Sequence, residues 1–319
     1  MNVGVVGAGV SGLSSAILLR QRGHDVTVWA RELHPHTTSN RAGAYWSPHA
    51  YPSAMDQRED VARWGEVSRL RFESLATDRD SACTVRTIVR VEDSHGPDAW
   101  WSRYIPTLQP MSSEQLPAGY EKGCQFDGVV IDTSLYMPYL MKTLTALGGS
   151  IVQRTVTDLG EAQEMFDVVV NCAGLGAREL VGDTSLYPTR GQLVRVPKNG
   201  LDHVIGDNLG RNALAYIVPR THDMVLGGTS QPHDDDLRPR DEDTAGILRK
   251  CAELSPLLRD VEILEVSVGL RPSRPRVRVE VETRNGRPVV HNYGHGGAGF
   301  MLSWGCAADV AERIAQLLG

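Results

Sequence analysis

The sequence predicts an α/β protein of two lobes. An apolar run at residues 2–6 leads through GAGVSG into a helical pattern that stops near Gly23, and a second apolar run follows at 25–30. This order of strand, glycine turn, helix and strand is typical of a Rossmann-type nucleotide-binding unit. Between about 190 and 284 the chain holds short strand-like pieces such as GQLVRV and VRVEVE. These predict a second, mostly antiparallel β lobe.

The remaining elements follow along the chain. Residues 129–156 predict a strand edge, a helix ending near Gly148 and another strand, and FDVVVNCAG (166–174) predicts a buried strand entering a glycine turn. Residues 289–318 return to strand, glycine loop and helix, whereas 54–122 are charged and show no clear alternation. We therefore expect a discontinuous nucleotide-binding domain. Its segments are 1–53, 123–189 and 285–319, and the substrate domain takes 54–122 and 190–284.

Composition limits the partners. The 319 residues are 41% hydrophobic and 23% charged, with a net charge of -6 and scattered basic residues, so neither nucleic acid nor a membrane is an expected partner. No run of about 18 apolar residues exists, and the N-terminus lacks a basic leader, so we expect a cytoplasmic protein. Five cysteines without C-x-x-C spacing predict reduced thiols and no metal site. The oligomeric state is open, with a homodimer among the alternatives.

The first glycine motif predicts dinucleotide binding. Gly7, Gly9 and Gly12 fit G-x-G-x-x-G between a strand and a helix, which is the context that the motif requires. Glu32, 20 residues after Gly12, can accept hydrogen bonds from an adenosine ribose. Arg31 beside it instead suits a 2′-phosphate, so an NADP-dependent dehydrogenase stays an alternative.

A second glycine loop favours FAD over a nicotinamide cofactor. The stretch VVHNYGHGGAGFMLSWG (289–305) holds five glycines, and the three-ring flavin would need a second place where backbone comes close. A helix starting near Gly297 would direct its positive end at the reduced, negatively charged flavin. A tight strand-to-helix turn is the simpler explanation of the same glycines.

The sequence resembles the FAD-dependent D-amino-acid oxidases and D-aspartate oxidases. The matching stretches span nearly the whole chain in the order of that family: VGVVGAGVSGLSSA, TTSNRAGAYWSPH, VVVNCAGLGAREL, RGQLVRV, YIVPR, LGGT, GLRPSRPRVR and HNYGHGGAGFMLSWG. The resemblance implies a two-lobed oxidase that holds FAD without a covalent bond. It implies oxidation of a D-amino acid to an imino acid and then to the 2-oxo acid and ammonia, with molecular oxygen reduced to hydrogen peroxide.

The resemblance also implies site residues. Arg271 matches the carboxylate-binding arginine, Tyr216 its companion tyrosine, and Gly297 completes the catalytic set. A guanidinium can hold a carboxylate through two parallel hydrogen bonds. Without the resemblance, Arg271 would be explained as a solvated strand charge and Tyr216 as an ordinary residue of an amphipathic strand. Residues implied at the flavin are Thr37, Thr38, Ala42, Gly43, Gly296, Gly297, Gly299, Phe300 and Met301.

Some positions depart from the mammalian pattern. Ala298 and Met301 stand where the mammalian members carry a tyrosine and a threonine. Asn212 stands near the position of the lid tyrosine of the mammalian D-amino-acid oxidase.

The expected chemistry needs no acid–base pair, because a neutral amine can assist departure of the α-hydrogen as hydride to flavin N5. Oxidation of glycine, sarcosine or another secondary amine, and flavin binding without turnover, remain alternatives.

The substrate side chain is the most open question. SPHAYP (47–52) resembles a stretch of D-aspartate oxidases, with His49 near the pocket, and Arg211 stands where those enzymes carry a basic loop residue. Ser230, however, stands where they typically carry an arginine, and a carboxylate without partners is costly to bury. We therefore expect broad or neutral D-amino-acid use ahead of an acidic preference.

Overall fold

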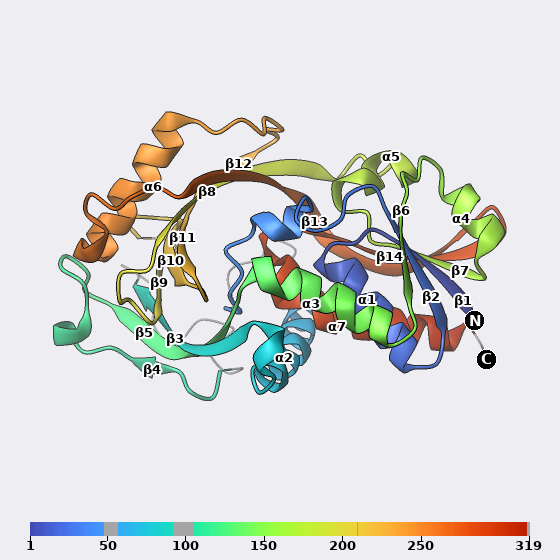
Figure 1. Ribbon diagram of the computed structural model, residues 1–319, viewed down its shortest axis with the longest axis horizontal. Helices are drawn as coiled ribbons and strands as arrows, with labels where there is room; N and C mark the ends of the chain where they lie inside the picture. Colours follow the sequence, from blue (N-terminus) through green and yellow to red (C-terminus); the bar gives the residue numbers. More distant parts are fainter. Residues whose placement is uncertain (48–56, 92–104, 209, 318–319) are drawn as a thin grey trace.

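One continuous β-sheet runs through the molecule. Figure 1 shows the computed structural model, which describes residues 1–47, 57–91, 105–208 and 210–317. Along the sheet the strands follow the order β4-β5-β3-β9-β10-β11-β8-β13-β14-β7-β1-β2-β6, and β12 pairs with β8. The two lobes predicted from the sequence are thus hydrogen-bonded parts of one sheet.

The parallel part of the sheet lies at the right of Figure 1. Its strands pair in the order β14, β7, β1, β2 and β6. They span Arg287–His295, Val168–Asn171, Asn2–Val6, Asp25–Ala30 and Ser150–Gln153 respectively. Valines fill both faces of β1 and β7, as is usual for parallel strands covered by helices on both sides.

Helices cover both faces of these parallel strands. The main apolar core joins one face to α1 (Val10–Gln21), α3 (Thr133–Ala146) and α7 (Gly299–Gln316). A smaller core joins the other face to α4 (Leu159–Met165) and α5 (Ala177–Val181). The helix α2 (Arg58–Leu75) packs closely on α7, where a Cβ on Gly305 would come within 2.2 Å of the Trp64 carbonyl oxygen.

The other half of the sheet is mostly antiparallel, with one parallel pair between β3 and β9. Its strands are β3 (Cys83–Val91), β4 (Gln109–Pro110), β5 (Gly123–Ile131), β8 (Tyr187–Pro197), β9 (Val204–Asp207), β10 (Ala215–Pro219), β11 (Asp223–Gly227) and β12 (Gln231–Pro232). On one face, which we call the α6 face, the helix α6 (Asp241–Leu254) covers a second apolar core. We call the opposite face, which carries Tyr216, the substrate face.

The strand β13 (Glu265–Arg284) connects the two halves. It pairs antiparallel with β8 over Glu265–Ser273 and with β14 further along, and in Figure 1 it runs across the top of the molecule. Short helical segments complete the described chain, among them η1 (Thr38–Arg41) and η8 (Gly296–Ala298), together with η3 (Arg79–Ser81), η5 (Ser113–Gln115), η6 (Gly174–Gly176) and η7 (Pro256–Leu258).

The structure confirms the predicted fold class, a mixed α/β architecture with a large, mostly antiparallel sheet. The exact domain boundaries stay a prediction, because the sheet has no break between the halves and α2, which lies in the segment 54–122, packs on α7. All five cysteines are buried as thiols. No helix in the described ranges is both long and apolar enough to cross a bilayer.

Candidate active site

The turn between β1 and α1 can be built only with glycine. Gly7 has φ +114°, and a Cβ there would lie 2.3 Å from the Cys172 carbonyl oxygen. A Cβ on Gly12 would lie 1.9 Å from the Gly7 carbonyl oxygen. Gly9 is the N-cap of α1 and, as a glycine, offers no side chain to cap the helix. The Val10 amide is bonded to Ser39 Oγ at 3.0 Å, which ties the turn to η1.

The start of α7 lies beside the start of α1. A Cβ on Gly299 would come within 3.9 Å of Val10 Cγ1, and no side chain caps α7 at its N-cap, Ala298. Gly296 adopts φ +52° in the preceding turn. Two helix N-termini whose own N-cap residues supply no capping side chain, each with the positive end of its dipole, therefore lie close together. This arrangement suits an extended anion such as a pyrophosphate or a reduced flavin.

The other predicted cofactor residues lie around these two turns. Arg31 and Glu32 follow β2 at the surface and form an ion pair at 3.3 Å. Thr37 is buried and donates to Asn40 Oδ1 at 2.8 Å, and Thr38 begins η1. Phe300 and Met301 place their side chains in the main core, and Ala42 packs against that core. Any contact of Phe300 or Met301 with a flavin would therefore have to come from the backbone.

The predicted substrate residues Arg271 and Tyr216 are brought together on the substrate face. Arg271 lies on β13 and Tyr216 on β10, and the guanidinium lies close enough to the Tyr216 hydroxyl to act on its pKa. Burial raises the pKa of Tyr216 to about 12, although the charge and hydrogen bond of Arg271 act in the opposite direction. The phenol thus stays protonated at physiological pH.

Glycines make room for both side chains. A Cβ on Gly227 would lie 1.9 Å from Tyr216 Cζ, and one on Gly191 would lie 2.3 Å from Arg271 Nη1. Gly43, from the loop after η1, also lies against the phenol, because its Cβ would be 2.8 Å from Tyr216 Cε2. The loop that is tied to the α1 turn therefore reaches the substrate residues.

Arg271 has no carboxylate partner within the part of the chain that the structure describes. Its Nη1 donates to the carbonyl oxygens of Thr229 at 2.9 Å and Arg190 at 3.4 Å. A half-buried guanidinium that is oriented by carbonyls and a phenol still has hydrogen-bond donors and a positive charge to offer. This is the chemistry of a carboxylate-binding site.

The three residues predicted for the substrate side chain have different outcomes. Arg211 lies on the α6 face, where its guanidinium covers the Tyr120 ring at 4.7 Å and donates to the Ala118 carbonyl at 2.8 Å. There it lines an apolar groove with Val89 and Leu254. Ser230 is exposed, next to Thr229, and His49 lies outside the described residues.

Two neighbours of Tyr216 were not predicted from the sequence, the aromatic Tyr45 and the charged Arg90. The Tyr45 ring lies 6.0 Å from the Tyr216 ring, and burial raises the pKa of Tyr45, partly offset by the charge of Arg90. Arg90 is buried on the substrate face, because it and Tyr216 both pair with Gly206. The alternation RTIVRV could have indicated that Arg90 points to one face, but not which one.

Comparison with known proteins finds relatives that match nearly the whole chain. A family model described as "FAD dependent oxidoreductase" matches residues 2–313. A D-amino-acid oxidase from Rubrobacter xylanophilus is 43% identical over 98% of this chain and 96% of the relative. Human D-aspartate oxidase is 33% identical over 98% of this chain and 94% of the relative.

Solved structures share the fold. The glycine oxidase from Geobacillus kaustophilus superposes with a TM-score of 0.80 at 19% identity, covering 98% of this chain and 94% of the other. At that identity the likeness concerns the fold alone.

Proposed function

The chain belongs to the family of FAD-dependent oxidoreductases, and from that premise we propose that it is a D-amino-acid oxidase. Its products would be a 2-oxo acid, ammonia and hydrogen peroxide. The observation that carries the proposal is Arg271, a half-buried cation without a carboxylate partner in the described ranges, held beside the Tyr216 hydroxyl. The cytoplasmic location and the homodimer stay predictions from the sequence.

The residues present fit FAD. The turns at Gly7–Gly12 and Gly296–Gly299 would hold its phosphates and ring system, and Glu32 its ribose, with Thr37, Thr38 and Gly43 along the way to the substrate face. When bound, FAD supplies the acceptor for two electrons. Arg31 is paired with Glu32, and the family gives the NADP-dependent alternative no support.

The chain's own part in the reaction is to bind and orient the substrate. Arg271 would take the α-carboxylate and Tyr216 would donate a further hydrogen bond, which fixes the Cα of the amino acid relative to the sheet. Neither group is a base at neutral pH, because arginine stays protonated and the pKa of Tyr216 is raised to about 12. The amine must therefore lose its proton without help from these two residues.

The test uses the purified protein as isolated. We expect flavin absorption near 450 nm, roughly where oxidised flavins absorb, and bleaching of that band under nitrogen by D-amino acids. Their L-enantiomers should leave the band unchanged. FAD should appear in the supernatant after heat denaturation, since no covalent link is expected. Bleaching by glycine or sarcosine alone would point to a glycine or secondary-amine oxidase, and no bleaching at all to a flavin-binding protein without turnover.

A preference for acidic substrates is the second candidate. Arg90 favours it, because it places a buried positive charge on the substrate face near Tyr45. Against it, Ser230 is uncharged and Arg211 lies on the α6 face. We retain broad or neutral use as the first proposal.

The ratio of kcat/KM for D-aspartate to that for D-alanine decides between the two candidates. If D-aspartate is preferred more than tenfold and Arg90→Leu removes the preference, the enzyme is selective for acidic D-amino acids and Arg90 provides that selectivity. Arg211→Ala serves as the matched control and should leave the ratio unchanged, because it removes an arginine from the opposite face.

A further inference from the structure

A fully buried arginine lies directly behind the substrate residues. On β8, Thr189 pairs with Arg271 and Arg190 pairs with Leu270. Because side chains alternate along a strand, Thr189 shares the substrate face with Arg271, whereas Arg190 points to the α6 face. The Arg190 side chain is 0% exposed, and so it cannot touch a substrate on the other side of the sheet.

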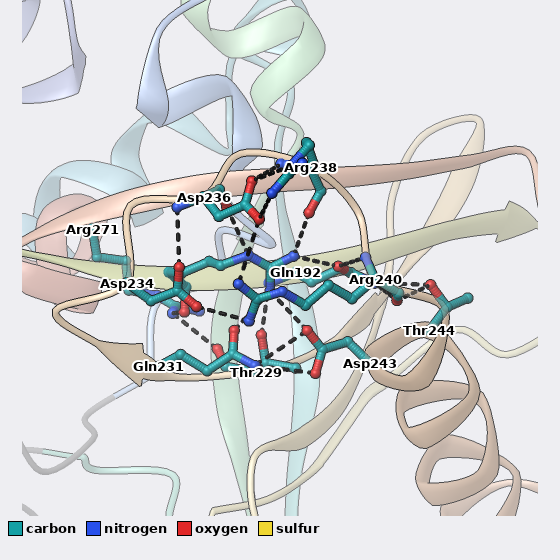
Figure 2. Close-up of polar contacts among 11 residues, drawn as sticks. Gln192, Thr229, Gln231, Asp234, Asp236, Arg238, Arg240, Asp243, Thr244 and Arg271 are labelled. Carbon is teal, nitrogen blue, oxygen red and sulfur yellow. Dashed lines mark hydrogen bonds and ion pairs between the residues drawn. The ribbon is translucent and has the colours of Figure 1, made fainter.

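All five N–H groups of Arg190 are hydrogen-bonded. They donate to three side chains, Gln192, Gln231 and Asp243, at 2.7–2.8 Å. They also donate to the carbonyl oxygens of Asp236 and Arg238, both at 2.7 Å. Figure 2 shows this network, with Arg271 at its side. One guanidinium thus fixes the chain from Gln231 to the first turn of α6.

The network extends to the carbonyl that orients Arg271. The side-chain oxygen of Gln192 accepts from Arg190, and the backbone N–H of the same residue donates to Thr229 Oγ1 at 2.9 Å. Gln231 pairs with Arg190 across the β8–β12 ladder, so Thr229 is fixed from both sides. The Thr229 carbonyl then accepts from Arg271 Nη1 at 2.9 Å, and the Arg190 carbonyl accepts from the same nitrogen at 3.4 Å.

We propose that Arg190 is a positioning residue for the substrate carboxylate: from the α6 face it fixes the Thr229 carbonyl that sets the orientation of Arg271. The inference rests on the proposed function, since it assigns Arg271 the carboxylate. A planar guanidinium with five donors can hold five acceptors at once, whereas a lysine has three donors and no fork. With their oxygens accepting from Arg190, Gln192 and Gln231 direct their NH2 groups to Thr244 and Asp243.

The experiment separates positioning from folding. Arg190→Lys keeps the buried charge opposite Asp243 but removes the fork. Thr229→Val is milder, because it keeps the carbonyl and a similar side-chain volume and removes only the hydrogen bond from the Gln192 backbone N–H. Arg220→Lys is the matched control, since Arg220 is also a buried arginine paired with a carboxylate, Asp223, yet it contacts none of the groups around Arg271.

Each holoenzyme is measured in four ways: the dissociation constant of benzoate from its effect on the flavin spectrum, KM and kcat for D-alanine, FAD content, and the melting temperature. Benzoate is the probe because it has a carboxylate and no amine. Charge-assisted hydrogen bonds depend strongly on geometry, so in Arg190→Lys we expect the benzoate dissociation constant and KM to rise about tenfold or more. In Thr229→Val they should rise about threefold. FAD content and kcat should stay within about twofold.

The outcomes are distinct. If Arg190→Lys fails to fold, Thr229→Val decides alone. Unchanged benzoate affinity in every variant that folds overturns the positioning role and leaves the proposed function intact. An equal loss in Arg220→Lys also overturns it, because that would be a general effect of losing a buried arginine. Wild-type protein that neither binds benzoate nor oxidises D-alanine overturns the proposed function and this inference together.

Discussion

At the scale of single residues, Arg271 is the group on which the proposed function depends. We predict that Arg271→Leu lowers kcat/KM for D-alanine, with a loss of transition-state stabilisation of about 3 kcal/mol or more. Charge-assisted contacts contribute about 1.5–3 kcal/mol each, and two are lost. Tyr216→Phe should cost about 1 kcal/mol, since one neutral donor is removed. Both variants should retain FAD, because neither residue belongs to the two glycine turns. Steady-state kinetics near those of the wild type for Arg271→Leu would remove this residue from the carboxylate site.

His295 gives a prediction about pH. Burial lowers its pKa to about 4, and Nε2 has no hydrogen-bond partner among the described residues. In the unfolded chain the pKa of this histidine is about 6.5. As pH falls from about 6.5 to about 4, the imidazole is therefore protonated in the unfolded state but stays neutral in the folded state. The free energy of unfolding should therefore fall on acidification, by up to about 3 kcal/mol from this group.

Urea denaturation of the holoenzyme at several pH values measures this dependence. His295→Gln is the comparison, because it cannot titrate and should lose less stability than the wild type between pH 7 and pH 4.5. Parallel curves for the two proteins would show that His295 is not the group responsible.

The sequence motifs predicted Arg271 and Tyr216, within GLRPSRP and AYIVP, and the structure brings the two side chains together. Their roles at a substrate stay a prediction. Arg211 was placed by its distance in sequence from Tyr216, and this spacing did not reveal that the side chain lies on the α6 face. The role of the Thr229 carbonyl as an acceptor for Arg271 could not be predicted, because every residue has a backbone carbonyl and the residue type does not show which one accepts.

At the scale of elements, two helical glycines should respond in opposite ways to the same substitution. A Cβ on Gly305 of α7 would lie 2.2 Å from the Trp64 carbonyl oxygen, whereas a Cβ on Gly246 of α6 would meet nothing within 4 Å. We predict that Gly305→Ala lowers the free energy of unfolding by about 1–2 kcal/mol, because the overpacking cost exceeds the gain in helix propensity. Gly246→Ala should raise it by up to about 1 kcal/mol. Chemical denaturation of both variants checks the signs, and stabilisation by Gly305→Ala would contradict the close approach of α2 and α7.

The elements predicted best were those with short, strongly apolar signals. The strands at 2–6 and 25–30 agree with β1 and β2, and the helix expected near Gly297 begins as η8 and continues as α7. The helix α2 was not predicted, because its many charged residues obscured the helical spacing of the residues that it buries. Val61, Trp64, Ser68, Phe72 and Leu75 are buried at helical spacing, and that periodicity was the available signal.

At the scale of the whole molecule, the unbroken sheet predicts one cooperative unit. The proposed FAD residues lie in the parallel half and the carboxylate residues in the antiparallel half, yet β13 is hydrogen-bonded to both. We predict a single calorimetric transition that moves to higher temperature as FAD is added. The gain should be about 2.7 kcal/mol at a free concentration one hundred times the dissociation constant. Two transitions, of which FAD moves only one, would show that the halves unfold independently.

The regular β8–β13 ladder also constrains how this protein can evolve. Arg271 faces the substrate because of its parity along β13, so an insertion or deletion of one residue between Glu265 and Ser273 would turn it toward α6. The tip of the β13–β14 hairpin, at Asn285 and Gly286, carries no such restriction, because both residues lie in a turn beyond the ladder. Natural length variation should therefore accumulate at the hairpin tip, while the segment that carries Arg271 diverges by substitution at constant length.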